Sequence, residues 1–176
     1  RNPRDGSRHA AGWTASCPAS DNGRYADAGG MGPPSPRREV VVDPKLLKAI
    51  ETLHGPADWV HLATTGRDGG PHVTPMMMGL QDPWLLFSLT GKQKIRNMER
   101  DPRACVAISK PGTMAHVVVW GTMEIRCDDE AQQIWEGMIT RAFGPEGLGQ
   151  RRRRLSREGT SLGLLTPQRQ RIYGIE

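Results

Sequence analysis

The chain has 176 residues, of which 36% are hydrophobic, and a formal net charge of +5 at pH 7. This length allows one well-buried core, because single domains typically run to about 100–150 residues. No apolar stretch approaches the roughly 20 residues that a membrane-spanning helix needs, and residues 1–30 lack the apolar run of a signal peptide. We therefore expect a soluble, cytoplasmic protein that does not bind membranes.

The basic charge predicts an anionic partner, and phosphate, nucleic acid and acidic lipid would each satisfy it. The histidines and cysteines are scattered without the CxxC or HExxH spacing of a metal site, so we expect no bound metal. Residues 151–154 are four consecutive arginines, a pattern that can indicate nucleic-acid binding. No aromatic residues are interleaved with them, which favours a solvated face or a clamp for an acidic coenzyme tail over a nucleic-acid site.

The composition divides the chain near residue 38. Residues 1–38 are rich in small, polar and charged residues without apolar periodicity, which predicts a disordered tail or a non-native leader. Residues 39–176 are expected to form a single domain. Its first element is a short helix that Asp43 caps and that ends before Gly55.

After this first helix, the sequence contains strand-like runs with two further helices between them. Helices are expected over the basic segment 92–103 and from Asp128 to Gly144-Pro145. Strand-like runs occupy 59–64, 72–79, 84–89, 104–109 and 114–126, with shorter pieces at 161–165 and 171–175. The run at 84–89 is nearly all apolar, which predicts burial on both faces. Meandering strands without repeated βαβ units favour a mainly β fold with inserted helices, a six-stranded antiparallel barrel, over a doubly wound sheet.

The segment from Lys92 to Arg103 carries five basic side chains against two acidic ones, a local excess of +3. The first turn of a helix presents unpaired N–H groups and the positive end of the helix dipole. Lys92 and Lys94 add full charges close to that end. The segment could therefore bind a phosphate, or it could be a solvated helix face whose charges only maintain solubility.

Four sequence pieces, taken in order, resemble a known family. They are ATTGRDGGPHVTPMMMG, WLLFSL, GKQKIRNMERDPRACVAI and VVVWGTMEI, and the ending LLTPQRQRIYGIE is similar to the same family's closing strand. Residues 43–126 thereby resemble the pyridoxamine 5'-phosphate oxidase-like split-barrel family, which includes flavin- and deazaflavin-dependent oxidoreductases. The resemblance implies a six-stranded split barrel that holds a coenzyme by its phosphate and uses it for redox chemistry on a small-molecule substrate.

The resemblance also implies which residues hold the coenzyme. Lys94 matches the family lysine that contacts the coenzyme phosphate, and Thr90 and Lys92 would lie beside the same phosphate. Arg96 and Asn97 match family positions at the start of the helix. No catalytic residue is assigned, because the coenzyme carries the hydride chemistry and the protein orients it.

Two coenzymes stay open, FMN and the deazaflavin coenzyme F-420. Gln93 stands where some family members have arginine, which departs from an FMN clamp. The arginine surplus tilts the choice slightly toward F-420, whose polyglutamate tail would attract cations. The strand expected to run along the isoalloxazine ring comprises Val73, Thr74, Pro75 and Met76.

In this family the coenzyme lies in a cleft between two subunits, so a homodimer is expected. Its second subunit would cover an apolar edge formed by Trp120 and residues 76–78. By residue type alone, the methionines at 76–78 are more often core filler, and His61 and His72 are more often satisfied structural groups. Core positions are likewise expected for Trp59, Trp84, Trp120 and Trp135. The alternative functions are a non-catalytic flavin or haem carrier and, less favoured, a basic nucleic-acid-binding module.

Overall fold

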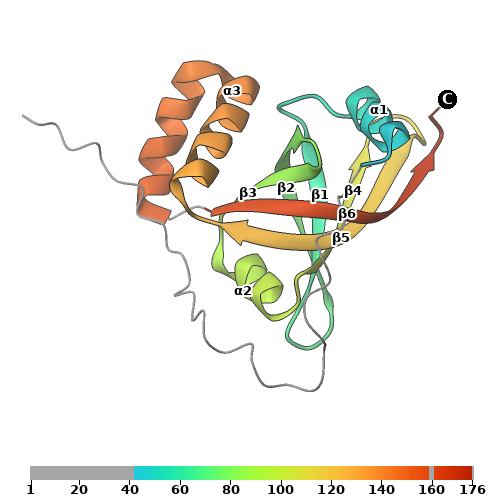
Figure 1. The fold of residues 1–176 in the computed structure, drawn as a ribbon, viewed down its shortest axis with the longest axis horizontal. Coiled ribbons are helices and arrows are strands. Elements are labelled where there is room, and N and C mark those ends of the chain that lie inside the picture. The colour runs from blue at the N-terminus through green and yellow to red at the C-terminus, as the bar shows by residue number, and fades with distance from the viewer. Residues whose placement is uncertain (1–41, 159–160, 176) are drawn as a thin grey trace, which may run out of the picture.

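The computed structural model describes residues 42–158 and 161–175, so the expectation for residues 1–38 lies outside the described residues. In this part of the chain six antiparallel strands close into a barrel in the order β1-β2-β3-β6-β5-β4 (Figure 1). Helices are inserted between the strands and surround the barrel. The prediction of a mainly β fold, a six-stranded antiparallel barrel with inserted helices, is confirmed.

The elements follow the expected order. The strands are β1 (Trp59–Thr65), β2 (Pro71–Gln81), β3 (Trp84–Leu89), β4 (Arg103–Ser109), β5 (His116–Arg126) and β6 (Ser161–Tyr173). The helices are α1 (Pro44–Leu53), α2 (Lys92–Arg100) and α3 (Asp129–Glu158). Asp43 caps α1 as expected, since its side chain accepts a hydrogen bond from the Lys45 N–H at 2.9 Å.

Two features near the C-terminus go beyond the expected elements. The pieces at 161–165 and 171–175 are parts of the single strand β6, because a bulge opposite Trp120 and Gly121 lets the polar interval continue the pairing with β5. The helix expected to stop at Gly144-Pro145 does end at this kink, and a second helix that was not expected follows it to Glu158, so α3 consists of two helices. Gly144 has φ 69° and kinks the chain there, and Pro145 then begins a second helical stretch.

The hydrophobic side chains form two clusters on the two sides of β3. Leu85 and Phe87 point into the barrel and are buried there, whereas Leu86 packs against Trp135 of α3 on the outer side. The prediction that this strand is buried on both faces is therefore confirmed. Larger members of the barrel cluster include Leu46, Ile50, Leu62, Met78 and Ile108.

The methionine run at 76–78 is buried on both sides of β2. Met76 and Met78 lie in the barrel, and Met77 lies under α3. Their expected role as core filler is confirmed, so the idea that they form an exposed apolar edge is wrong. Trp135 is a core residue as expected, and Trp84 and Trp120 are half-buried. Trp59 is 59% exposed, because the alternation of β1 directs Val60 and Leu62 inward and Trp59 outward.

Gly121 allows β5 and β6 to approach each other at the bulge. A Cβ at this position would lie 2.1 Å from the Thr166 carbonyl oxygen, so the backbone would have to move. We expect Gly121→Ala to lower the free energy of unfolding by about 1–3 kcal/mol in urea denaturation. Gly137→Ala is the control, because its Cβ meets no atom within 4 Å. Equal stability losses in the two variants would contradict this role of Gly121.

Candidate functional site

The turn that leads from β3 into α2 brings Thr90, Gly91 and Lys94 together. Gly91 precedes the helix with φ 89°, and no side chain caps the first turn of α2. The Lys94 ammonium folds back over this turn and donates a hydrogen bond to the Thr90 carbonyl oxygen. A Cβ at Gly91 would lie only 3.3 Å from Lys94 Nζ, so glycine keeps this approach to the ammonium open. The first-turn N–H groups and the ammonium thus form one positive site.

Lys94 is the basic residue of α2 whose surroundings are best suited to binding an anion. Its side chain is half-buried, and burial lowers its pKa from 10.5 by desolvating the ammonium. Among the described residues no carboxylate lies within ion-pair distance of Lys94. A charge that is partly removed from water without a counterion is stabilised when an anion binds beside it.

The other predicted residues of α2 divide into exposed and buried ones. Lys92 and Arg96 are exposed. Asn97 is fully buried, and its amide donates to Thr64 Oγ1 at 3.1 Å and accepts from Gln93 Nε2 at 2.9 Å. The Gln93–Asn97–Thr64 contacts fix α2 against β1, so these two amides position the site.

In the predicted strand Val73–Met76, successive side chains point to opposite sides of the barrel wall. Val73 and Pro75 point outward and are exposed, whereas Met76 is buried inside. Thr74 Oγ1 is buried without a hydrogen-bond partner, and so is Nδ1 of His72. His72 is therefore not the satisfied structural group that the sequence suggests. These two atoms leave unused hydrogen-bonding capacity along the same strand.

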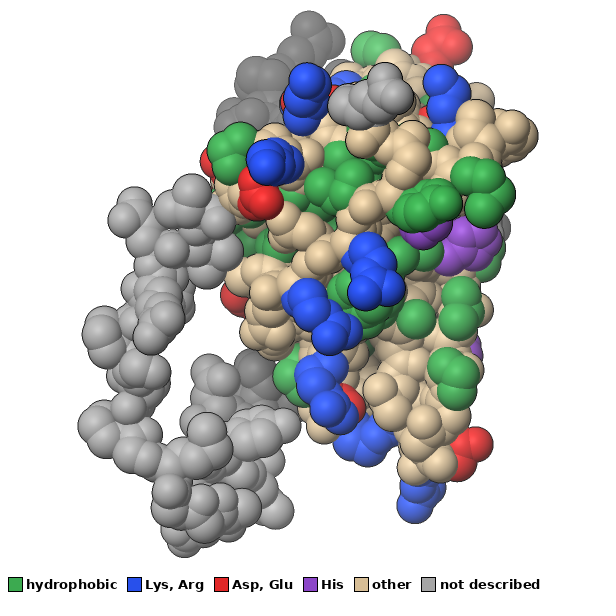
Figure 2. All heavy atoms as spheres, turned by 90° about the vertical axis from the view of Figure 1, so that its right-hand side faces the viewer, with side chains coloured by type: hydrophobic (Ala, Val, Ile, Leu, Met, Phe, Trp, Pro, Cys, Tyr) green, Lys and Arg blue, Asp and Glu red, His purple; other side chains and the backbone are tan. Residues whose placement is uncertain are grey.

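The register places side chains from five strands on one outer face of the barrel, called here the outer sheet face. One row across it runs Val73, Ala63, Cys105, Trp120, Arg169, and the next runs Pro75, His61, Ala107, Val118, Arg171. Figure 2 views this side of the molecule, where hydrophobic side chains gather beside a series of basic ones. The alternation within each strand directs these side chains outward, but only the strand order of the barrel brings them onto one face.

An open cavity of about 380 Å³ lies on the outer sheet face near Ala63, Thr65, Cys105 and Trp120. The Arg169 guanidinium lies 4.2 Å from the centroid of a Trp120 ring, and the rings of His116 and Tyr173 stack at 5.2 Å. Burial raises the pKa of the Cys105 thiol, which favours its protonated form. A flat ring flanked by cations can be held here by stacking and charge.

Asp101 and Arg103 form an ion pair at the edge of this cavity, where α2 leads into β4. Arg103 donates to Asp101 Oδ2 at 2.7 Å through its side chain and to Oδ1 at 3.1 Å through its backbone N–H. These hydrogen bonds lower the pKa of Asp101 from 3.8 to about 2. The pair thus favours the ionised carboxyl in the folded chain.

The lowered pKa of Asp101 predicts a pH dependence of stability. A depressed pKa stabilises the fold above pH 3.8, and this contribution is lost as the pH falls toward about 2. We expect Asp101→Asn to cost about 1 kcal/mol or less at pH 7, since Arg103 is exposed to solvent. The difference from the parent protein should shrink between pH 4 and pH 2 in urea denaturation. A difference that is constant over this range would contradict the assignment.

The arginine run lies in the last part of α3 (Figure 1), and Ser161, the first residue of β6, pairs with Leu89 directly before the turn that starts α2. Arg152 pairs with Glu136 at 2.5 Å, and the Arg151 guanidinium lies 4.1 Å above the Phe143 ring. Both contacts fix the kinked second part of α3 on its first part. Within the described ranges no group of three or more potential ligands could hold a metal, and no helix there is long and apolar enough to cross a membrane.

The fold and the site define a class of protein, an antiparallel barrel with a basic helix start at one end and an apolar outer face. The profile of the pyridoxamine 5'-phosphate oxidase family matches residues 46–161, and the chain belongs to that family. No curated protein matches the sequence.

Several solved structures share the fold. A structure named F420 reductase is 22% identical, with a TM-score of 0.53, covering 69% of this chain and 94% of the other. A conserved hypothetical protein from Mycobacterium tuberculosis is 23% identical, with a TM-score of 0.60 and coverages of 78% and 89%. A heme binding protein from Mycobacterium smegmatis is 24% identical, with a TM-score of 0.56 and coverages of 77% and 57%. At these identities the likeness shows the fold alone.

Proposed function

We propose that this protein is an oxidoreductase that binds FMN or coenzyme F-420 and reduces or oxidises a small molecule. The observation that carries the proposal is the half-buried Lys94 ammonium, which faces the uncapped start of α2 without an ion-pair partner among the described residues. Membership of the pyridoxamine 5'-phosphate oxidase family and the fold shared with an F420 reductase support it.

The residues present fit a phosphate-bearing coenzyme. Lys94 and the first N–H groups of α2 would bind the phosphate, with Thr90, Lys92 and Arg96 beside it. Asn97 would hold α2 in place through its hydrogen bond to Thr64, and Gln93 would support Asn97 by donating to its amide oxygen. The bound coenzyme would supply hydride transfer.

Strand β2 and the outer sheet face would hold the ring of the coenzyme. Val73 and Pro75 offer an exposed apolar edge on the outer side of β2. A planar ring against such a surface would be shielded from water on one side. The chain's own part in the reaction would be to orient the coenzyme.

Turnover separates an oxidoreductase from a carrier. The protein is mixed under anaerobic conditions with a many-fold excess of reduced FMN or reduced F-420, as the electron donor, and of an artificial acceptor such as a soluble quinone, beside the same mixture without protein. We expect the protein to accelerate the oxidation of the reduced coenzyme by the acceptor over many equivalents per protein. Consumption of a single equivalent would indicate a carrier instead.

We further propose that the protein is a homodimer formed through the outer sheet face. Trp59 is 59% exposed there, and Val73 and Tyr173 are each 55% exposed, which is unusual for large apolar side chains on one face. Light scattering is expected to give the mass of a dimer, and Trp59→Asp is expected to shift it toward the monomer. A monomeric parent protein at working concentration would contradict the proposal.

A haem-binding module is the second candidate. His61 is exposed on the outer sheet face and could approach an iron centre, and one structure with this fold is named a heme binding protein. Haem titration followed by the Soret band distinguishes the two functions. A saturable shift that His61→Ala removes, without any binding of FMN or F-420, would favour the haem module.

A further inference from the structure

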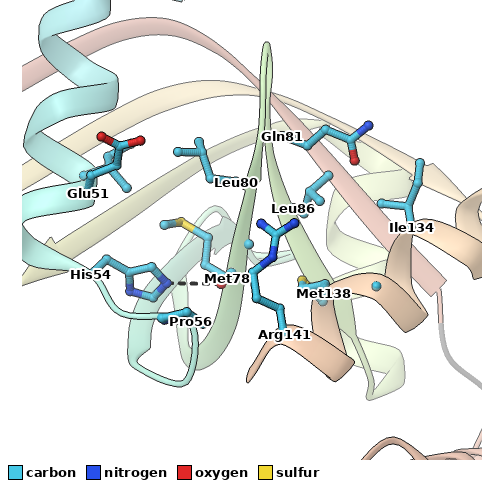
Figure 3. A pocket seen from close by; sticks show the side chains of 13 residues that line it. Glu51, His54, Pro56, Met78, Leu80, Gln81, Leu86, Ile134, Met138 and Arg141 are labelled. Carbon is cyan, nitrogen blue, oxygen red and sulfur yellow. Dashed lines mark hydrogen bonds between the residues drawn. The ribbon is translucent and has the colours of Figure 1, made fainter. Parts of the chain in front are cut away.

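A second cavity, of about 470 Å³, lies away from the predicted coenzyme residues. Its walls come from α1, from the end of the β2–β3 hairpin and from α3 (Figure 3). This volume falls within the range of about 300–1,000 Å³ that is typical of small-molecule sites. Strands rise about 3.3 Å per residue, so Met78 at this cavity lies about 7 Å along β2 from Met76, and Gly79 about 13 Å from Pro75. The lining of the cavity contains none of the residues assigned to the coenzyme ring.

Apolar side chains make the floor of this cavity. Met78, Leu86 and Met138 are buried there, with Leu80 and Ile134 partly buried around them. A set of flexible methionine side chains beside leucines adapts to ligands of irregular shape. The floor would accommodate an aliphatic or aromatic body.

Two glycines explain why the cavity exists. A Cβ at Gly79 would lie 2.8 Å from Met138 Cγ, so glycine lets α3 approach β2 at the back of the cavity. A Cβ at Gly137 would meet no atom within 4 Å, although this residue also lines the cavity. The missing side chain at Gly137 therefore leaves the wall on the α3 side open.

The polar groups of the cavity favour a ligand with one negative charge. The side chain of Arg141 extends from α3 toward β2 and β3 (Figure 3), and its guanidinium makes no hydrogen bond or ion pair with any described residue. On the opposite wall His54 Nε2 lies 3.1 Å from the Met78 carbonyl oxygen, to which it donates. Glu51 of α1 is the other charged residue in the lining, and it would repel a second negative charge on the ligand.

We propose that this cavity binds an amphipathic monocarboxylic acid. Its apolar body would lie on Met78, Leu86 and Met138, and its carboxylate would pair with the Arg141 guanidinium, whose planar fork matches a carboxylate. A phosphate dianion would meet one cation and the Glu51 carboxylate, which disfavours it. This proposal goes beyond the coenzyme chemistry and does not depend on it.

The test uses the full chain with methionine methyl groups labelled with ¹³C, titrated with 4-phenylbutyrate and with its neutral amide. Phenylbutyrate is expected to shift the methyl signals of Met78 and Met138, which line the cavity, and to leave those of Met98 and Met123 in place. The amide is expected to bind about threefold to fivefold more weakly, because it lacks the charge-assisted pairing with Arg141, which is exposed to solvent.

Three variants complete the experiment. Arg141→Gln should weaken phenylbutyrate binding to the level of the amide. Gly137→Trp should fill the cavity and abolish the shifts, whereas Gly137→Ala should leave them unchanged. Unchanged signals of Met98 and Met123 verify that each variant is folded. Absence of shifts in the parent protein at millimolar ligand, equal affinities for acid and amide, or an unaffected Arg141→Gln variant would overturn the proposal, and none of these results depends on coenzyme binding.

Discussion

Replacement of Trp135 by alanine is expected to lower the free energy of unfolding by about 3–5 kcal/mol. The Trp135 ring is 1% exposed and belongs to the cluster that joins α3 to the outer side of β2, β3 and β6. Its indole N–H donates to Ser88 Oγ at 2.8 Å, so the substitution leaves both a cavity and a half-buried hydroxyl without this partner. Urea denaturation followed by circular dichroism measures the loss.

Gln133→Ala is the matched control for Trp135→Ala. Gln133 lies on the same helix with its side chain exposed, so its replacement is expected to change the stability by no more than about 0.5 kcal/mol. A loss below 1 kcal/mol for Trp135→Ala would mean that α3 does not depend on this cluster for its position. The wall that α3 contributes to the second cavity would then be in doubt as well.

Replacement of Lys94 by alanine is expected to weaken coenzyme binding by about 1.5–3 kcal/mol, or more than tenfold. The half-buried ammonium has already lost part of its hydration, so little further desolvation opposes its pairing with a phosphate. Within the described part of the chain, the Lys94 side chain makes one hydrogen bond, to the Thr90 carbonyl oxygen. Because so little depends on this side chain, the fold should tolerate its removal. Tryptophan quenching on titration with the coenzyme measures the affinity.

Lys110→Ala is the control for the net charge, because Lys110 is exposed in the turn between β4 and β5. Its replacement should leave the affinity within a factor of two, in keeping with the small effects of exposed charges. Equal affinities of Lys94→Ala and the parent protein would place the phosphate elsewhere. A loss confined to Arg152→Ala would indicate an anionic tail near α3 and would favour F-420.

The barrel could be predicted because its strands are separated by strong local signals. Alternating or continuous apolar runs stand between turns rich in Gly, Pro and Asp, and these signals act over a few residues. The same alternation could have placed Trp59 outward, since Val60 and Leu62 face the core. Residue type alone gave the wrong prediction there, because it does not identify which face of a strand is covered.

The second half of α3 could not be predicted from local signals. Gly144-Pro145 is a typical helix stop, yet proline is also well suited to the first turn of a new helix. Leu148 of the second stretch packs against the cluster that contains Trp135 and Ile139 of the first, and the Arg152–Glu136 ion pair also joins the two stretches. These contacts join residues that only the folded chain brings close.

The candidate site was predicted in part. The position of Lys94 at a helix start follows from the basic segment itself, and the structure adds its burial and its contact with Thr90. The outer sheet face and the cavity beside Arg141 are formed by elements from distant parts of the sequence. No local sequence pattern therefore predicts them. Asn97 is a residue type often seen in binding sites, but its burial and its bonds to Gln93 and Thr64 give it a positioning role.

Titration of the protein with FMN and with F-420, each followed by tryptophan quenching, tests the central claim most directly. Saturable binding of one of them that weakens more than tenfold in Lys94→Ala and stays unchanged in Lys110→Ala is the result that we predict. Binding of neither coenzyme at micromolar concentration would contradict the proposed function, and the basic start of α2 would then be a solvated helix face.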